Sequence, residues 1–215
     1  MSSTVTIGFE LSSDDVYSVA GWCAAEMAVD EANQTGDLPV EVNLEVIVNE
    51  KNRDSARRAA SDFVARDDAI AVLGPTNSAM AVISQDIYAD ADILQMSSEA
   101  SSPLLTNKGY THFFRTVAND EVQGRALARV AISHIKAKRI AILNEDSAWG
   151  EPISEIFSAE AKRLGVEPVL HYGYGAKERE LDYDELIDAT VAARPDLVYF
   201  AVYWNQTHIL AHRLR

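Results

Sequence analysis

Residues 71–82 read AVLGPTNSAMAV. An apolar run passes through a Gly-Pro pair into the small polar residues Thr76, Asn77 and Ser78, and a helix-forming segment follows at once. In open α/β sheets, ligands bind at the carboxyl ends of the strands. Because a helix N-terminus exposes N–H groups and the positive end of the helix dipole, the stretch predicts a place for an anionic group.

A second turn of the same kind follows one strand later. Residues 94–106 read LQMSSEASSPLLT, in which an apolar start predicts a strand and the turn after it contains four serines. Two successive strands that end in hydroxyl-rich turns are well suited to hold a carboxylate. The alternative is that these Ser and Thr side chains serve only as helix N-caps, and the sequence leaves that alternative open.

The whole chain alternates between strand patterns and helix patterns. Strict alternation with continuous apolar strands predicts an α/β protein with parallel sheets that are covered by helices on both faces. Two blocks of this alternation, joined near residues 116–120, predict two Rossmann-like lobes, an N-terminal lobe at residues 1–117 and a second lobe at residues 118–215. Strands are expected at 4–10, 41–48, 69–73, 91–97, 112–117, 139–145, 167–174 and 196–203; helices are expected at 16–33, 54–65 with Asp54 as its N-cap, 78–89, 120–137, 152–164, 183–193 and 206–215.

The composition limits the classes of partner. With 215 residues, of which 47% are hydrophobic, the chain is long enough for a sizeable core. A net charge of −14 argues against nucleic acid and against anionic membrane surfaces as partners. The single cysteine, Cys23, excludes an intrachain disulfide, and its apolar neighbours predict a buried thiol. No apolar run is long enough to span a membrane, and no signal peptide is recognisable, which leaves the compartment open.

Motifs for catalysis or metal binding are weak. His208 and His212 share a helix face at metal-ligand spacing, but no third ligand is evident, so two surface histidines and no metal site are expected. Glu99 lies in a candidate binding turn without a nucleophile nearby, and the common nucleotide and hydrolase motifs are absent. We therefore expect no cofactor and no enzyme activity, and an enzyme with a Rossmann-like core stays open as an alternative.

Several segments together resemble a known family. They are residues 71–106, the segment GYTHFFRTVANDEVQGRALA (109–128), the segment RIAILNEDSAWGEPI (139–153) and the segment DLVYFAVYW (196–204). In content and order they resemble the type I periplasmic binding proteins, and among these the leucine/isoleucine/valine-, amide- and urea-binding proteins of ABC transporters. The resemblance extends over essentially the whole chain.

The resemblance implies a ligand site with contributions from both lobes. The turns at Thr76, Asn77 and Ser78 and at Ala100 and Ser101 are expected to hold the α-carboxylate and α-ammonium groups of the ligand. Ser78 and Ser101 would donate to the carboxylate, whereas the carbonyl of Ala100 and the hydroxyl of Ser101 would lie near the ammonium.

Three aromatic residues are implied as well. Tyr17 is expected to contact the ligand from the first lobe, and Trp149 and Tyr203 from the second. The chain departs from the family pattern at residues 13–15, where Ser-Asp-Asp replaces the usual glycine, and at Trp149, where many members have Tyr or Phe. These departures leave the identity of the ligand open.

The resemblance implies an extracytoplasmic solute-binding protein that closes on a small amino acid or amide about a hinge near 116–120 and delivers it to an ABC permease. It implies a periplasmic or extracellular location, with a lipid anchor in the precursor as one form. A ligand-sensing receptor or regulator of the same fold is the alternative. Family members are longer, so the chain is expected to be a truncated form with an incomplete second lobe, and self-association would cover the apolar surface left bare.

Overall fold

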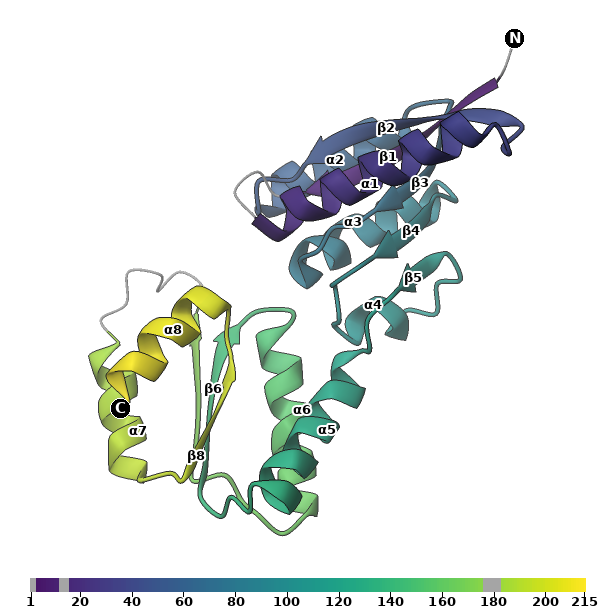
Figure 1. The fold of residues 1–215 in the computed structure, drawn as a ribbon. Coiled ribbons are helices and arrows are strands. Elements are labelled where there is room, and N and C mark those ends of the chain that lie inside the picture. The colour runs from purple at the N-terminus through teal and green to yellow at the C-terminus, as the bar shows by residue number, and fades with distance from the viewer. Residues whose placement is uncertain (1–2, 12–15, 176–182) are drawn as a thin grey trace. The chain divides into compact units, whose positions relative to one another are not determined.

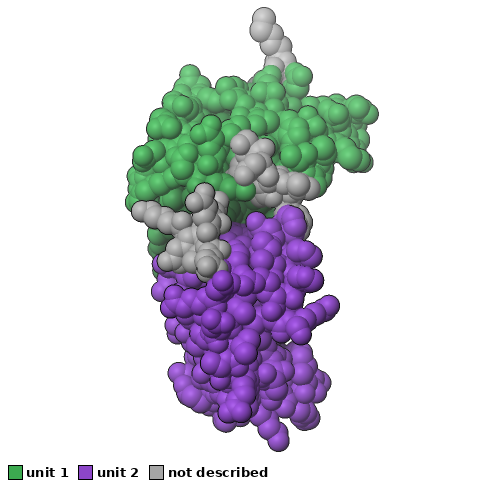
Figure 2. Space-filling view, turned by 90° about the vertical axis from the view of Figure 1, so that its left-hand side faces the viewer, with its two compact units in different colours: residues 1–117 green, residues 118–215 purple. Residues whose placement is uncertain are grey.

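The computed structural model describes residues 3–11, 16–175 and 183–215, and the side chains of residues 3, 16 and 17 lie outside the described part (Figure 1). Contacts divide the chain into two compact units, Met1–Val117 and Ala118–Arg215 (Figure 2). Each unit has its own parallel sheet and its own apolar core. The Ser-Asp-Asp segment at residues 13–15 lies outside the described residues.

Unit 1 contains a five-stranded parallel sheet in the order β2-β1-β3-β4-β5. The chain moves outward from β1 to β2 and then returns to β3 on the other side of β1. The strand order therefore reverses at β1 and β3, and open sheets bind ligands next to such a reversal. The elements are β1 (Ser3–Leu11), α1 (Val16–Thr35), β2 (Val40–Val48), α2 (Arg53–Val64), β3 (Ala69–Leu73), α3 (Ser78–Asp90), β4 (Leu94–Ser97), α4 (Leu104–Asn107) and β5 (Phe113–Arg115).

Unit 2 contains a three-stranded parallel sheet in the order β7-β6-β8, which repeats the β2-β1-β3 arrangement. Helices α5 and α6 cover one face of this sheet, and α7 and α8 cover the other (Figure 1). Both faces have an apolar core, and on the α6 side Phe157 stacks on Tyr199 with ring centroids 4.1 Å apart. The elements are α5 (Asp120–Arg129), the π-helical turn η1 (Val130–His134), β6 (Ile140–Asp146), α6 (Gly150–Arg163), β7 (Leu170–Gly175), α7 (Asp184–Ala193), β8 (Leu197–Ala201) and α8 (Trp204–Arg213).

The α/β fold class with parallel sheets and flanking helices is confirmed. Two local predictions are wrong. The N-cap of α2 is Asn52, whose Oδ1 accepts the N–H of Ser55 at 2.8 Å, and Asp54 lies inside the first turn of the helix. Cys23 is exposed rather than buried. Its neighbours Val19 and Met27 on α1 are exposed too, because α1 is apolar around much of its circumference and an apolar neighbourhood alone does not identify the buried face.

One face of the unit 1 sheet exposes apolar side chains. Met96 on β4 pairs in register with Phe114 on β5, so both point to the same face, where Leu94 joins them. Phe114 is 48% exposed, and the other two are more than one-third exposed. Self-association through apolar surface stays a prediction.

The opposite face of the unit 1 sheet contains a buried carboxyl group. Glu10 on β1 is fully buried under α3, where its oxygens accept hydrogen bonds from Tyr88 Oη at 2.8 Å and Asn49 Nδ2 at 3.1 Å. Burial raises the pKa of Glu10 to about 7, and the hydrogen bonds from Tyr88 and Asn49 oppose that rise. The carboxyl group of Glu10 therefore links α3 to the end of β1, and this group is protonated below a pH of about 7.

This carboxyl group gives a pH-dependent stability. Between the usual pKa of glutamate and a pKa of about 7, the folded chain holds a proton that the unfolded chain has released. The free energy of unfolding therefore falls as pH rises through this window, by roughly 3 kcal/mol from this one group. In Glu10→Gln that component of the slope is expected to vanish in urea unfolding measured from pH 4.5 to 7.5. The exposed Glu155→Gln serves as the control and should keep the wild-type slope; an unchanged slope in Glu10→Gln would contradict the assignment.

Candidate functional site

Hydrogen bonds join the two hydroxyl-rich turns of unit 1 side by side. The hydroxyl of Ser97, at the end of β4, donates to the carbonyl of Pro75 at 2.7 Å. The backbone N–H of Ser102 donates to the hydroxyl of Ser78 at 3.3 Å, and the N–H of Gly74 donates to the carbonyl of Met96 at 2.7 Å. The turn after β3 and the turn after β4 thus form one surface at the carboxyl ends of adjacent strands.

The N-terminus of α3 is capped so that one donor remains. Asn77 is the N-cap, and its Oδ1 accepts the N–H groups of Ala79 at 2.9 Å and Met80 at 3.3 Å. Within the described part of the chain, the N–H of Ser78 has no hydrogen-bond partner. The hydroxyl of Ser78 accepts from Ser102 and keeps its own proton for donation. The sequence suggested that these turn residues were either N-caps or ligand donors, and the structure gives the cap to Asn77.

The turn after β4 leaves donors at Ser101. The hydroxyl of Ser97 accepts the N–H groups of Glu99 at 3.4 Å and Ala100 at 3.0 Å, and Ser102 uses its N–H as described above. Across residues 3–11, 16–175 and 183–215, neither the N–H nor the hydroxyl of Ser101 has a partner. Since buried backbone N–H groups are rarely left unpaired, and Ser101 is only 6% exposed, these donors suit a ligand.

The other predicted contacts of unit 1 differ in how far the structure describes them. Thr76 lies beside α1, where its Oγ1 is 3.3 Å from the hydroxyl of Ser18. Tyr17 precedes Ser18 in the first turn of α1, but its side chain lies outside the described residues. The carbonyl of Ala100 accepts a hydrogen bond from Arg115 Nη1 at 3.2 Å, which leaves only its second lone pair for another donor.

In unit 2 the two predicted aromatic residues lie together. Trp149 precedes α6 and Tyr203 precedes α8, so each follows one of two adjacent strands, and their ring centroids are 5.5 Å apart. Both residues are partly buried. Gly150 allows this arrangement, because the Cβ of any other residue at this position would clash with the backbone oxygens of Glu145 and Ala201. The close approach keeps the start of α6 against the strand ends.

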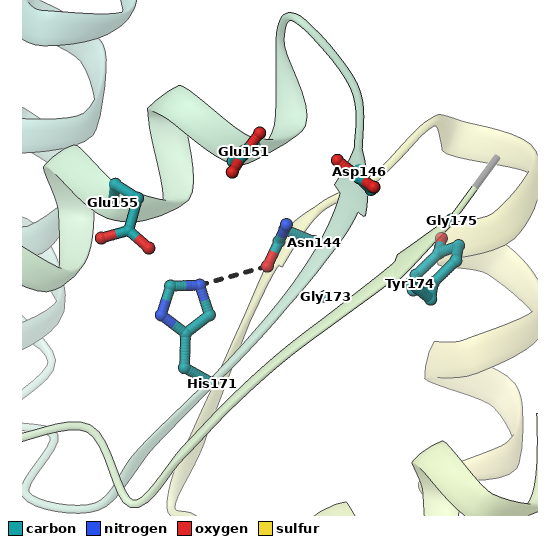
Figure 3. A pocket seen from close by; sticks show the side chains of 8 residues that line it. All are labelled: Asn144, Asp146, Glu151, Glu155, His171, Gly173, Tyr174 and Gly175. Carbon is teal, nitrogen blue, oxygen red and sulfur yellow. Dashed lines mark hydrogen bonds between the residues drawn. The ribbon is translucent and has the colours of Figure 1, made fainter.

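Unit 2 also contains an acidic cavity that was not predicted from the sequence (Figure 3). Its volume is about 440 Å³, and Trp149 and Tyr203 are not among its lining residues. His171 Nε2 lies 3.1 Å from Asn144 Oδ1 and 3.2 Å from Ser154 Oγ. Ser154 donates its own proton to the carbonyl of Glu151, so both partners of Nε2 accept and Nε2 carries the hydrogen. The lining residues are Asn144, Asp146, Glu151, Glu155, His171, Gly173, Tyr174 and Gly175.

Two further properties bear on function. Among the residues that the structure describes, no group of three or more His, Cys, Asp and Glu side chains is arranged to hold a metal ion. None of the described helices combines the length and the apolar character needed to cross a membrane. His208 and His212 lie on α8, outside any such group.

The sequence analysis did not identify three residues whose hydrogen bonds hold the two turns in place. Ser97 joins the two turns, Ser18 contacts Thr76, and Arg115 holds the turn after β4. The serine-rich composition of residues 97–102 pointed to the correct turn but did not distinguish serines that bind the protein from those that face outward. For Arg115 the only signal was its place at the end of a strand within HFFRTV.

Comparison with known proteins gives the family. The model of a family described as periplasmic binding protein matches residues 6–212. The Leu/Ile/Val-binding protein BraC3 of Rhizobium johnstonii is 27% identical over 190 residues, which are 88% of this chain and 51% of that protein. A leucine-, isoleucine-, valine-, threonine- and alanine-binding protein of Pseudomonas aeruginosa is 26% identical over 192 residues, 89% of this chain and 51% of that protein. The chain thus spans about half the length of these relatives.

Solved structures agree with the fold. The branched-chain amino acid transporter substrate-binding protein LivJ of Streptococcus pneumoniae, in complex with isoleucine, has a TM-score of 0.87 and 22% identity, covering 99% of this chain and 61% of that one. The leucine-binding protein LivK of Thermotoga maritima has a TM-score of 0.84 and 20% identity, covering 98% and 60%. At these identities the likeness shows the fold alone.

These comparisons bear on the classes that the sequence left open. The matched family is made up of solute-binding proteins rather than enzymes, and the names of the relatives do not favour a sensor. Because the family model matches nearly the whole chain, the chain belongs to the periplasmic binding protein family.

Proposed function

We propose that this chain binds the α-carboxylate of a small, branched-chain amino acid at the two joined turns of unit 1, as a solute-binding protein of an ABC transporter. The observation that supports the proposal is the set of unpaired donors at the ends of two adjacent strands. These are the N–H groups of Ser78 and Ser101 and the hydroxyl of Ser101, and the hydroxyl of Ser78 has a proton to add.

The chemistry of these donors fits a carboxylate. Several N–H and O–H groups that converge at a helix N-terminus stabilise negative charge, and α3 contributes the positive end of its dipole. Hydrogen bonds to an ionised acceptor are stronger than those between neutral groups. An amide or urea would gain less from the same donors, because its carbonyl oxygen carries only a partial charge. An amino acid is therefore preferred over an amide.

The choice of a branched-chain side chain rests on the relatives. Two of the curated relatives are named for binding leucine, isoleucine and valine, and a solved structure of the same fold is in complex with isoleucine. By the same analogy the proposed partner is an ABC permease and the proposed location is outside the cytoplasmic membrane. A lipid anchor stays a prediction from the family resemblance.

Removal of the serine hydroxyls tests the carboxylate assignment. Ser101→Ala is expected to weaken the binding of L-leucine by about 1.5–3 kcal/mol, a rise in Kd of about 10- to 150-fold, because it removes a hydrogen bond to a charged group. Ser78→Ala should weaken the binding of L-leucine more than Ser101→Ala does, since it also leaves the N–H of Ser102 without its acceptor. Isothermal titration calorimetry with L-leucine, L-isoleucine, L-valine, acetamide and urea gives the measurement.

Ser98→Ala is the matched control, because Ser98 lies in the same turn with an exposed side chain. It should leave the Kd for L-leucine within twofold of the wild type. A Ser78→Ala, Ser101→Ala double variant that binds L-leucine as tightly as the wild type would refute the assignment of the two turns.

Trp149 and Tyr203, which the family resemblance assigns to the ligand, are proposed to bind its apolar side chain. Trp149→Ala is expected to raise the Kd for L-leucine at least about tenfold, through loss of apolar contact area. The neighbouring Trp204, which is 67% exposed, provides a control of equal size. If Trp149→Ala and Trp204→Ala give the same small change in Kd, Trp149 does not contact the ligand.

A further inference from the structure

The guanidinium group of Arg115 holds the turn that presents Ser101. Arg115 is the last residue of β5, the outer strand of the unit 1 sheet. Its Nη1 donates to the carbonyl of Ala100 at 3.2 Å and to the carbonyl of Ser102 at 2.9 Å, and its Nη2 donates to the hydroxyl of Thr106 at 2.8 Å. One side chain therefore fixes the backbone on both sides of Ser101.

Because the peptide between Ala100 and Ser101 is planar, the hydrogen bond from Arg115 to its carbonyl also sets the direction of its N–H. The carbonyl of Ala100 and the N–H of Ser101 belong to the same peptide unit, and in a trans peptide they point to opposite sides. Among the described residues the only cis peptide bond is Gly74–Pro75, so the unit between Ala100 and Ser101 is trans. Since its carbonyl faces Arg115, its N–H faces away from Arg115, and this N–H is one of the unpaired donors.

The next peptide is fixed from the other side. The N–H of this peptide, which belongs to Ser102, donates to the hydroxyl of Ser78. The carbonyl of Ser102, in the peptide after it, accepts from Arg115. Rotation of the Ser101 backbone would break at least one of these hydrogen bonds. A positive charge at the carbonyl end of the Ala100–Ser101 peptide also polarises that peptide, which makes its N–H a stronger donor.

We propose that Arg115 is a positioning residue for anion binding, which aims the N–H of Ser101 at the ligand carboxylate without contacting the ligand itself. The inference rests on the proposed function of the two turns. The planar fork of arginine is suited to the task, because it reaches two carbonyls and a hydroxyl from one rigid group, whereas the ammonium of lysine is a compact charge without a fixed fork.

Substitution of Arg115 tests the proposal through affinity and stability together. Arg115→Met should raise the Kd for L-leucine about tenfold or more, and Arg115→Lys should restore part of the loss. Arg139→Met is the matched control, because Arg139 also donates to two backbone carbonyls, those of Ala193 and Arg194 in unit 2. It should leave the Kd unchanged even where its midpoint of thermal unfolding falls as far as that of Arg115→Met.

A double-mutant cycle separates positioning from a purely structural role. Because Arg115 fixes the backbone on both sides of Ser101, it sets the position of the Ser101 hydroxyl together with that of the N–H. If Arg115 acts through Ser101, the losses from Arg115→Met and Ser101→Ala are therefore less than additive in the double variant, whereas independent effects add. Additive losses, a wild-type Kd in folded Arg115→Met, or failure of both Arg115 variants to fold would each overturn the inference. If Ser101→Ala and Ser78→Ala leave binding intact, the proposed function of the turns fails first; if they weaken binding and Arg115→Met does not, only the role of Arg115 fails.

Discussion

The candidate site depends on the hydrogen bonds that join the turn after β3 to the turn after β4. Ser97 donates to Pro75, and Ser102 donates to Ser78. These contacts use many of the polar groups of the turns and leave a few donors over. The proposed anion site consists of these remaining N–H and O–H groups, which are buried and have no hydrogen-bond partner among the residues that the structure describes.

The same arrangement of strands appears twice in the chain. In each unit the first strand lies between the second and the third, so the ends of the first and third strands are neighbours. Unit 1 places small polar residues at its strand ends and unit 2 places Trp149 and Tyr203 at the ends of β6 and β8. One topology thus presents hydrogen-bond donors at the strand ends of unit 1 and aromatic side chains at the strand ends of unit 2.

Much of the fold was predictable, and the reasons are local. Apolar runs such as residues 69–73 and 139–145 identify buried parallel strands, and a polar turn after a strand marks the edge where ligands bind. The helix period was less informative for α1, where apolar residues surround the helix and the exposed Cys23 was expected to be buried. The N-cap of α2 was displaced by two residues, because Asn52 and Asp54 are both good caps and only the backbone conformation decides between them.

The site was predictable as a set of turns but not as a set of roles. Composition showed that residues 97–102 are rich in hydroxyl groups, yet which hydroxyl binds the protein depends on contacts with Pro75 and Ser78 from another strand. Arg115 is farther along the chain and acts on carbonyl groups, which every residue has, so no sequence pattern marks its targets. Long-range pairing of this kind is decided by the packed sheet.

The proposed site requires that the backbone N–H groups of Ser78 and Ser101 bind the ligand carboxylate. Two-dimensional ¹H–¹⁵N correlation spectra of the labelled protein, recorded during titration with L-leucine, observe those two groups directly. Both amide protons are expected to move downfield on saturation, as protons do when they enter a hydrogen bond to a carboxylate. If L-leucine binds and shifts other amides while those of Ser78 and Ser101 stay in place, the claim is contradicted.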